Sequence, residues 1–121
     1  MLGKALALSP DSAFLQYELG LWLKRHEQHE YALLALSRAV ELDPDNADYR
    51  YTLAVTLHEL DQPDAAQKQL ETVLNRQPAN RRVRVLLIQY WKESGQLQNV
   101  QVSLAELERQ NPDDPALQQG L

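Results

Sequence analysis

The residues best suited to chemistry are the histidines and glutamates of the segment His26-Glu27-Gln28-His29-Glu30. Imidazole and carboxylate groups bind zinc and transfer protons, so this cluster is compared first with the spacing that such chemistry needs. The helical zinc-protease motif places its second histidine four residues after the first. Here the second histidine follows after three residues, and position 30 is a glutamate. The spacing therefore predicts exposed polar side chains at a turn and no metal site.

The rest of the sequence offers no complete catalytic or cofactor-binding pattern. There are no cysteines, which excludes thiolate nucleophiles, disulfides and zinc–thiolate sites. The 4 glycines are scattered, so no phosphate-binding loop exists, and no Gly-x-Ser-x-Gly motif occurs. His58 stands alone, and Trp22 and Trp91 are expected to pack between helices. We therefore expect no enzyme activity, no cofactor and no bound metal.

Composition and charge favour a folded protein whose partner is another protein. The chain is 44% apolar and 24% charged, and its net charge of -5 disfavours nucleic acid, which needs a basic surface. No apolar run approaches the ~18 residues that a membrane-inserted helix needs. A basic cluster is interpreted as a solvated loop and helix start, with a basic end of a groove as the alternative; it comprises Arg76, Arg81, Arg82 and Arg84. Composition leaves the compartment open.

A period of 34 residues organises the whole chain. Prolines recur at that interval, at Pro10, Pro44, Pro78 and Pro112. Leucine columns keep the same register, at Leu19, Leu53 and Leu87, and at Leu36, Leu70 and Leu104. Apolar residues between the prolines recur at helical spacing, with a break midway in each period. The pattern predicts two antiparallel helices per period, at residues 12–25 and 30–42, 46–59 and 64–76, and 80–93 and 98–110.

Small residues recur where the two helices of a pair should touch. Gly20 and Ala32 in the first period, and Ala54 and Ala66 in the second, allow the helix backbones to approach closely. In the third period Ile88 and Val100 replace these small residues. We therefore expect the third helix pair to pack wider or skewed.

The pattern Leu19-Gly20, Ala32, Leu36, Ala39 and Pro44 resembles the tetratricopeptide repeat (TPR) motif nearly in full. The resemblance covers residues 12–113 and implies an all-α fold, a right-handed α-α superhelix of three helix-turn-helix repeats with partial repeats at both ends. The large residue common early in the first helix of a TPR is replaced by Gln16, Arg50 and Arg84, whose aliphatic stems are expected to cover part of the same surface.

The stretches RYTLAVTLHEL and WKESG are similar to C-terminal TPR tails of proteobacterial multi-domain proteins. Some proteins of that kind are exported and carry multihaem cytochrome domains upstream. This chain itself contains no haem-attachment motif of the Cys-x-x-Cys-His type.

We expect a single TPR domain over residues 1–121, divided into repeats at 12–45, 46–79 and 80–113. Residues 2–9 match the second half of the last helix of a preceding repeat, because Leu2, Ala5, Leu6 and Leu8 align with Leu36, Ala39, Val40 and Leu42. Residues 114–121 form a short C-terminal stub. The Val40 column becomes Leu74 and then Glu108, as the polar outer face of a terminal repeat requires. We expect the protein to continue upstream, and an apolar N-terminal end to favour self-association.

In TPR proteins the first helix of each repeat lines a concave groove. The equivalent columns here give the candidate groove residues Phe14, Tyr17, Leu21, Lys24, Tyr51, Val55, His58, Arg82, Val85, Gln89 and Lys92. The groove begins apolar and aromatic and ends more polar and basic, which suits an amphipathic helix or an extended apolar peptide. The alternative is that these residues pack against a neighbouring repeat or segment. If Tyr17 faces an open groove, Tyr17→Ala should mostly spare stability.

One well-defined TPR ligand is excluded by the groove residues. Carboxylate-clamp TPRs, which bind chaperone C-terminal tails, need lysine, asparagine and arginine at positions that are held here by Tyr17, Leu21, Thr52, Arg82 and Leu86. Only Arg82 fits, so we reject binding of chaperone tails.

Three functional hypotheses remain. The first is a protein-interaction scaffold that binds a peptide or helix in the concave groove. The second is a structural role, in which the array packs on its own upstream domain or self-associates. The third is an accessory role beside an enzyme or a cytochrome-type domain outside this chain.

Overall fold

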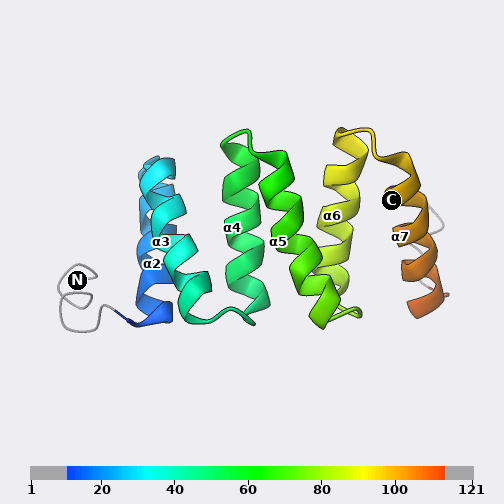
Figure 1. The fold of residues 1–121 in the computed structure, drawn as a ribbon, viewed down its shortest axis with the longest axis horizontal. Coiled ribbons are helices and arrows are strands. Elements are labelled where there is room, and N and C mark those ends of the chain that lie inside the picture. The colour runs from blue at the N-terminus through cyan, green and yellow to red at the C-terminus, as the bar shows by residue number, and fades with distance from the viewer. Residues whose placement is uncertain (1–10, 114–121) are drawn as a thin grey trace. The chain divides into compact units, whose positions relative to one another are not determined.

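The computed structural model describes residues 11–113, and this part of the chain consists of α-helices without any strand. The helices are α2 (Ala13–Arg25), α3 (His29–Leu42), α4 (Ala47–Glu59), α5 (Pro63–Arg76), α6 (Arg81–Glu93) and α7 (Leu97–Gln110), shown in Figure 1. Each predicted helix is confirmed, with its end at the predicted residue and its start within one residue. None of these helices is long and apolar enough to cross a membrane. The partial repeats expected at residues 2–9 and 114–121 lie outside the described residues.

By its internal contacts the chain divides into two units, residues 1–69 and residues 70–121, with the boundary inside α5. The first unit contains α2, α3, α4 and the beginning of α5. The second unit contains the end of α5, α6 and α7. The packing of each unit is given separately below.

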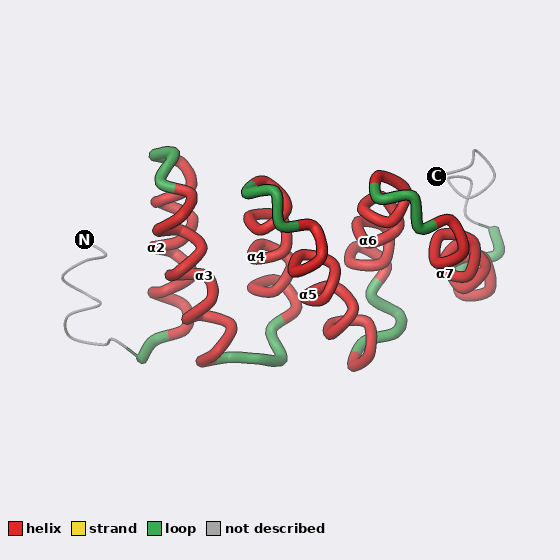
Figure 2. The backbone as a smooth tube through the Cα atoms, turned by 45° about the horizontal axis from the view of Figure 1, so that its top comes forward, coloured by secondary structure: helices red, strands yellow, loops and turns green. Residues whose placement is uncertain are grey.

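The turn inside each repeat reverses the chain in the same way (Figure 2). A residue with positive φ stands at the same place in every repeat, at Glu27 (58°), Asp61 (60°) and Gly95 (73°). The next amide then donates back to the helix that has just ended, in the bonds Gln28 N to Leu23 O (2.8 Å), Gln62 N to Leu57 O (2.9 Å) and Gln96 N to Trp91 O (2.9 Å). This bond and the left-handed residue define a Schellman-type helix end. The chain therefore turns within three residues and starts the second helix of the pair.

The first helix of each repeat begins with a side-chain cap. The oxygen of Ser12 accepts from Leu15 N at 3.2 Å, and Asn46 and Asn80 accept from the equivalent amides at 3.1 Å. All three caps have extended backbone, with φ between -83° and -71°. The chain therefore enters α2, α4 and α6 with the same local geometry.

The small residues of the first pair do allow close approach, as the sequence predicts. A Cβ atom added at Gly20 would lie 2.7 Å from both Cγ and Cδ2 of Leu36. Ala32 and Leu36 are completely buried, so Leu36 has little room to move. The contact between Gly20 and Leu36 thus sets the distance between α2 and α3.

The third pair packs differently, as expected from its larger residues. Ile88 is 2% exposed and Val100 6% exposed, and with Leu107 they form a buried cluster between α6 and α7. The backbones of α6 and α7 come close at fewer positions than those of α2 and α3. Trp91 packs against the Ile88 cluster, which confirms the prediction for this tryptophan.

The prediction for Trp22 is wrong. Its side chain is 43% exposed and stacks on the imidazole of His26, with ring centroids 4.0 Å apart. The equivalent residues of the other repeats, Thr56 and Tyr90, are buried. Trp22 therefore occupies a position that is covered in repeats two and three and open in repeat one.

Arg50 and Arg84 stand at the position where TPRs commonly have a large residue early in the first helix. They cover part of that surface with their aliphatic stems and also form hydrogen bonds there. Arg50 donates from Nε to Pro44 O at 2.8 Å and from Nη1 to Gln69 Oε1 at 2.8 Å. Arg84 makes the matching bonds in the second unit, to Pro78 O at 3.0 Å and to Ser103 Oγ at 3.0 Å. Each guanidinium thus ties the loop that precedes its own helix to the second helix of the same repeat.

We predict that Gly20→Leu lowers the free energy of unfolding by about 1–3 kcal/mol, because the new side chain must displace the buried Leu36. Urea denaturation followed by circular dichroism measures this. Ala105→Leu, at an exposed site on α7, is the matched control and should leave the midpoint nearly unchanged. Equal midpoints for the two variants would contradict the close approach of α2 and α3.

We predict that Arg50→Ala lowers the free energy of unfolding by about 1–2 kcal/mol, because two hydrogen bonds from a charged group are lost. Arg50→Lys keeps a cation and most of the stem, but its single ammonium cannot reproduce the two-armed contact, so it should recover only part of the loss. Thermal unfolding measures the Tm of both Arg50 variants, with Arg25→Ala, at the exposed end of α2, as the control. A lysine variant as stable as wild type would show that the guanidinium bonds do not contribute.

Candidate functional site

The predicted groove residues of the first unit form one stripe on each of two helices. Phe14, Tyr17, Leu21 and Lys24 are spaced so that they share a face of α2. Phe14 is 60% exposed, whereas the other three are half-buried. The matching stripe on α4 comprises Tyr51, Val55 and His58, which are all half-buried.

Tyr17 is not a free groove residue, because it holds α2 against α4. Its hydroxyl lies 3.0 Å from Oγ1 of Thr52, and its ring stacks on Tyr49 with centroids 4.6 Å apart. Burial raises the pKa of the Tyr49 hydroxyl, and the nearby carboxylate of Asp43 raises it further. The Tyr49 hydroxyl therefore stays uncharged at neutral pH. Sequence columns could not reveal this contact, since Tyr17, Tyr49 and Thr52 belong to three different columns.

Lys24 is also engaged between the same two helices. Its Nζ lies 3.0 Å from Oε1 of Glu59, at the far ends of α2 and α4. The lysine side chain is mostly covered, while Glu59 remains exposed. The ammonium expected at the polar end of this stripe is thus balanced by a carboxylate in the same unit.

The predicted groove residues of the second unit also lie on one helix face. Arg82, Val85, Gln89 and Lys92 follow the same spacing along α6. Arg82, Gln89 and Lys92 are exposed, and Val85 packs against the cluster of Ile88, Val100 and Leu107. This stripe is polar where the stripe on α2 is apolar.

The histidine cluster of the first turn carries no metal-site geometry. Nδ1 of His26 lies 2.8 Å from Trp22 O, and the imidazole stacks on the indole. Nδ1 of His29, the first residue of α3, is buried without a hydrogen-bond partner. Among the described residues, no three histidine, aspartate or glutamate side chains are grouped so that they could hold a metal ion.

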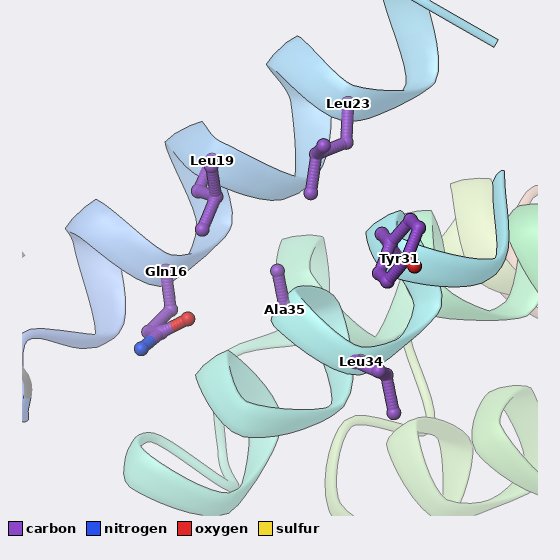
Figure 3. Close-up of a pocket in the computed structure, with 6 residues that line it drawn as sticks. All are labelled: Gln16, Leu19, Leu23, Tyr31, Leu34 and Ala35. Carbon is purple, nitrogen blue, oxygen red and sulfur yellow. The ribbon is translucent and has the colours of Figure 1, made fainter. Parts of the chain in front are cut away.

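An open apolar groove lies between α2 and α3 (Figure 3). By their spacing, its α2 residues lie on another face of that helix than the Phe14 stripe. The groove has a volume of about 380 Å³ and is lined by Gln16, Leu19, Leu23, Tyr31, Leu34 and Ala35. Tyr31 and Leu34 are exposed, and Leu19 and Leu23 are only half-buried. In repeat two the equivalent leucines, Leu53 and Leu57, are buried. Tyr31 and Leu34 were not predicted as part of any site, and the apolar N-terminal end expected at residues 2–9 lies outside the described residues.

Solved structures give the fold an independent comparison. The chain is similar to a crystal structure of MamA, with a TM-score of 0.81 and 22% identity over 92% of this chain and 61% of that one. It is also similar to residues 41 to the end of MamA from Desulfovibrio magneticus RS-1, with a TM-score of 0.78 and 19% identity over 96% and 66% of the two chains. A third structure, YrrB, is described as a TPR protein with an unusual peptide-binding site; its TM-score is 0.78, with 22% identity over 96% and 60%. At these identities the similarity shows the fold alone, a TPR-type helical solenoid.

The chain spans about three fifths of the length of these MamA and YrrB structures. No curated protein sequence matches it. The family model for the tetratricopeptide repeat matches residues 23–87, which are 65 of the 121 residues. With more than half of the chain matched and three capped helix pairs in the same register, this protein belongs to the tetratricopeptide repeat family.

Proposed function

We propose that the protein is an interaction scaffold that binds a peptide or a helix of another protein on the face formed by the first helices of its repeats. The observation that carries this proposal is the stripe that begins at Phe14. A phenylalanine ring that is 60% exposed lies in line with Leu21 on α2, and α4 beside it presents Val55. Exposed aromatic and aliphatic side chains on one rigid surface are the usual anchors of a protein interface.

Two interactions make this surface rigid before any partner binds. The Tyr17 contacts join α2 to α4 on one side of Leu21, and the ion pair of Lys24 with Glu59 joins them on the other. A surface that is already ordered loses less conformational entropy when it binds. The half-buried side chains between the two contacts can then receive an apolar residue of the partner.

The chemistry of the two stripes indicates the kind of ligand. The α2 and α4 stripes offer apolar contacts at Phe14, Leu21 and Val55, whereas the α6 stripe carries the cations of Arg82 and Lys92. A peptide with apolar anchors suits the α2 and α4 stripes, and the α6 stripe, taken by itself, suits acidic residues. The likeness to YrrB, a TPR protein with a peptide-binding site, supports a peptide as the ligand class.

A catalytic role forms no part of this proposal. TPR repeats generally serve as scaffolds, and no group of three potential metal-binding side chains occurs among the described residues. A protein of this family acts by holding its partner. An enzyme or cytochrome-type domain outside this chain would supply any chemistry.

A structural role is the second candidate, and the groove between α2 and α3 favours it. Leu19, Leu23 and Leu34 there present apolar surface on a face different from the Phe14 stripe. Such a surface suits packing on a preceding part of the same protein or on a second copy. Because the two faces are separate, substitutions in each one test the two roles independently.

We predict that a random peptide library, panned against the chain, yields a motif with apolar residues at helical or alternating spacing. Phe14→Ala combined with Leu21→Ala should weaken binding of the selected peptide at least tenfold, because about 1.4 kcal/mol of apolar contact is lost. Fluorescence anisotropy with the labelled peptide measures the Kd.

The matched control for the library is Tyr31→Ala combined with Leu34→Ala, which removes similar apolar area from the α2–α3 groove. This control should leave the Kd unchanged. Failure to select any motif, or equal loss of binding in both double variants, would argue against the proposed binding face. Circular dichroism must first show equal helicity in all variants.

We predict that Tyr17→Ala lowers the free energy of unfolding by about 3–4 kcal/mol, because a packed aromatic ring is removed. A tyrosine that faced an open groove would instead be replaced with little loss of stability. Tyr17→Phe keeps the stack on Tyr49 and loses only the hydrogen bond to Thr52, so it should cost about 0.5–1.5 kcal/mol. Urea denaturation separates the two. An alanine variant as stable as wild type would show that Tyr17 does not hold α2 against α4.

A further inference from the structure

One side of α2 is turned away from the other described helices of the first unit. At about 100° per residue, Tyr17, Gly20 and Lys24 share one side of the helix. That side contacts α3 through Gly20 and α4 through the other two residues. The side turned away from these contacts, called here the Trp22 face, carries residues spaced as in a pair of packed helices: Leu15, Glu18, Trp22 and Arg25.

The equivalent positions of α4 are all in contact with α2 or buried. These positions hold Tyr49, Thr52, Thr56 and Glu59. The first two contact Tyr17, the last pairs with Lys24, and Thr56 is completely buried. On α2 the same columns stay open, since Trp22 is 43% exposed although His26 stacks on it. A surface that is used for packing in α4 is thus unpartnered in α2 within the described part of the chain.

Two charged side chains give the Trp22 face a pattern that α4 lacks. Glu18 is half-buried and Arg25 is exposed, and neither has an ion-pair partner among residues 11–113. They stand seven residues apart, about 10 Å along the helix, which is too far for them to pair with each other. Where α4 has Glu59 for Lys24, α2 has a cation that would repel a lysine. What suits this face therefore offers a cation to Glu18 and a carboxylate to Arg25.

We propose that two copies of this chain form a symmetric dimer through the Trp22 face, with their α2 helices antiparallel. A two-fold axis beside Trp22 brings Glu18 of one copy to Arg25 of the other, and the reverse pair forms by symmetry. Helices packed about 8–10 Å apart allow such long side chains to meet. The two Trp22 rings lie near the axis, where burial removes their apolar surface from water. The dimer deepens the structural role given as the second candidate function, and it does not depend on peptide binding.

The dimer is weak, because each copy contributes only one helix face. Such a contact buries less than the ~1,200 Å² of a stable interface, so we expect a Kd on the order of 100 µM. The chain is then monomeric at the low micromolar concentrations of optical unfolding. The predicted changes in unfolding free energy therefore refer to the monomer.

Charge reversal in the full chain tests the two ion pairs, with sedimentation equilibrium at about five times the expected Kd. Glu18→Arg sets like charges against each other in both pairs and should weaken the dimer roughly tenfold or more, and so should Arg25→Glu. An equimolar mixture of these two variants has opposite charges in both pairs. It should form a heterodimer with a Kd within about threefold of the wild-type value. Glu30→Arg makes the same charge change at the exposed start of α3 and, as the control, should leave the dimer unchanged.

Three results would overturn the proposal, once circular dichroism has shown equal helicity in all variants. They are a wild-type chain that stays monomeric, a dimer that Glu18→Arg leaves intact, and a loss of dimer that mixing the two variants does not reverse. A dimer that only Tyr31→Ala combined with Leu34→Ala weakens would place the contact in the α2–α3 groove instead. These measurements contain no peptide, so their failure leaves the peptide-binding proposal to its own test with Phe14→Ala and Leu21→Ala.

Discussion

The tight chain reversal inside each repeat is the constraint on which the helix pairs depend. A residue in the left-handed region at Glu27, Asp61 and Gly95 returns the chain within three residues, so the second helix must run back along the first. Only Gly95 adopts that conformation without a Cβ penalty; at Glu27 and Asp61 the penalty is about 1–2 kcal/mol each. The fold tolerates this cost because the reversal places whole columns of apolar residues face to face. The contact of Gly20 with Leu36 exists only because the turn aligns them.

Much of the fold could be predicted from the sequence, because it depends on local periodicity and on the spacing of 34. Helix ends were predictable from the prolines and from the midway breaks, and the close approach of α2 and α3 was predictable from Gly20. The wrong prediction for Trp22 has a physical reason. A repeat column assigns one environment to all its members, but Trp22 lies in the first repeat, where the helix that buries Thr56 in the next repeat has no described counterpart. Predicting a residue's burial from the equivalent residues of other repeats is least reliable in the first and last repeats of an array.

The candidate site was less predictable, because its decisive contacts cross between columns. The partners of Tyr17 are Tyr49 and Thr52, which are 32 and 35 residues away and so fall on either side of the repeat period. The ion pair of Lys24 with Glu59 has the same offset of 35. Such contacts depend on the packing angle and the relative shift of neighbouring helices, here α2 and α4. A residue can therefore occupy a sequence column that lines the groove in TPR proteins and still pack against the neighbouring helix, as Tyr17 does. Phe14, Leu21 and Val55 are thus the better candidates for ligand binding in the first unit.

The arginine contacts explain why the first repeat differs from the second at the α2–α3 groove. In repeat two, Arg50 and Gln69 join across the equivalent place and fill it with a long stem and two hydrogen bonds. In repeat one the same positions hold Gln16 and Ala35, which are too short to meet in this way and which line the open groove. The first repeat therefore lacks the arginine–glutamine contact of the second, and the apolar surface of Leu19 and its neighbours stays open. The residues in these two columns thus distinguish a repeat whose side chains meet across its helix pair from one whose groove stays open.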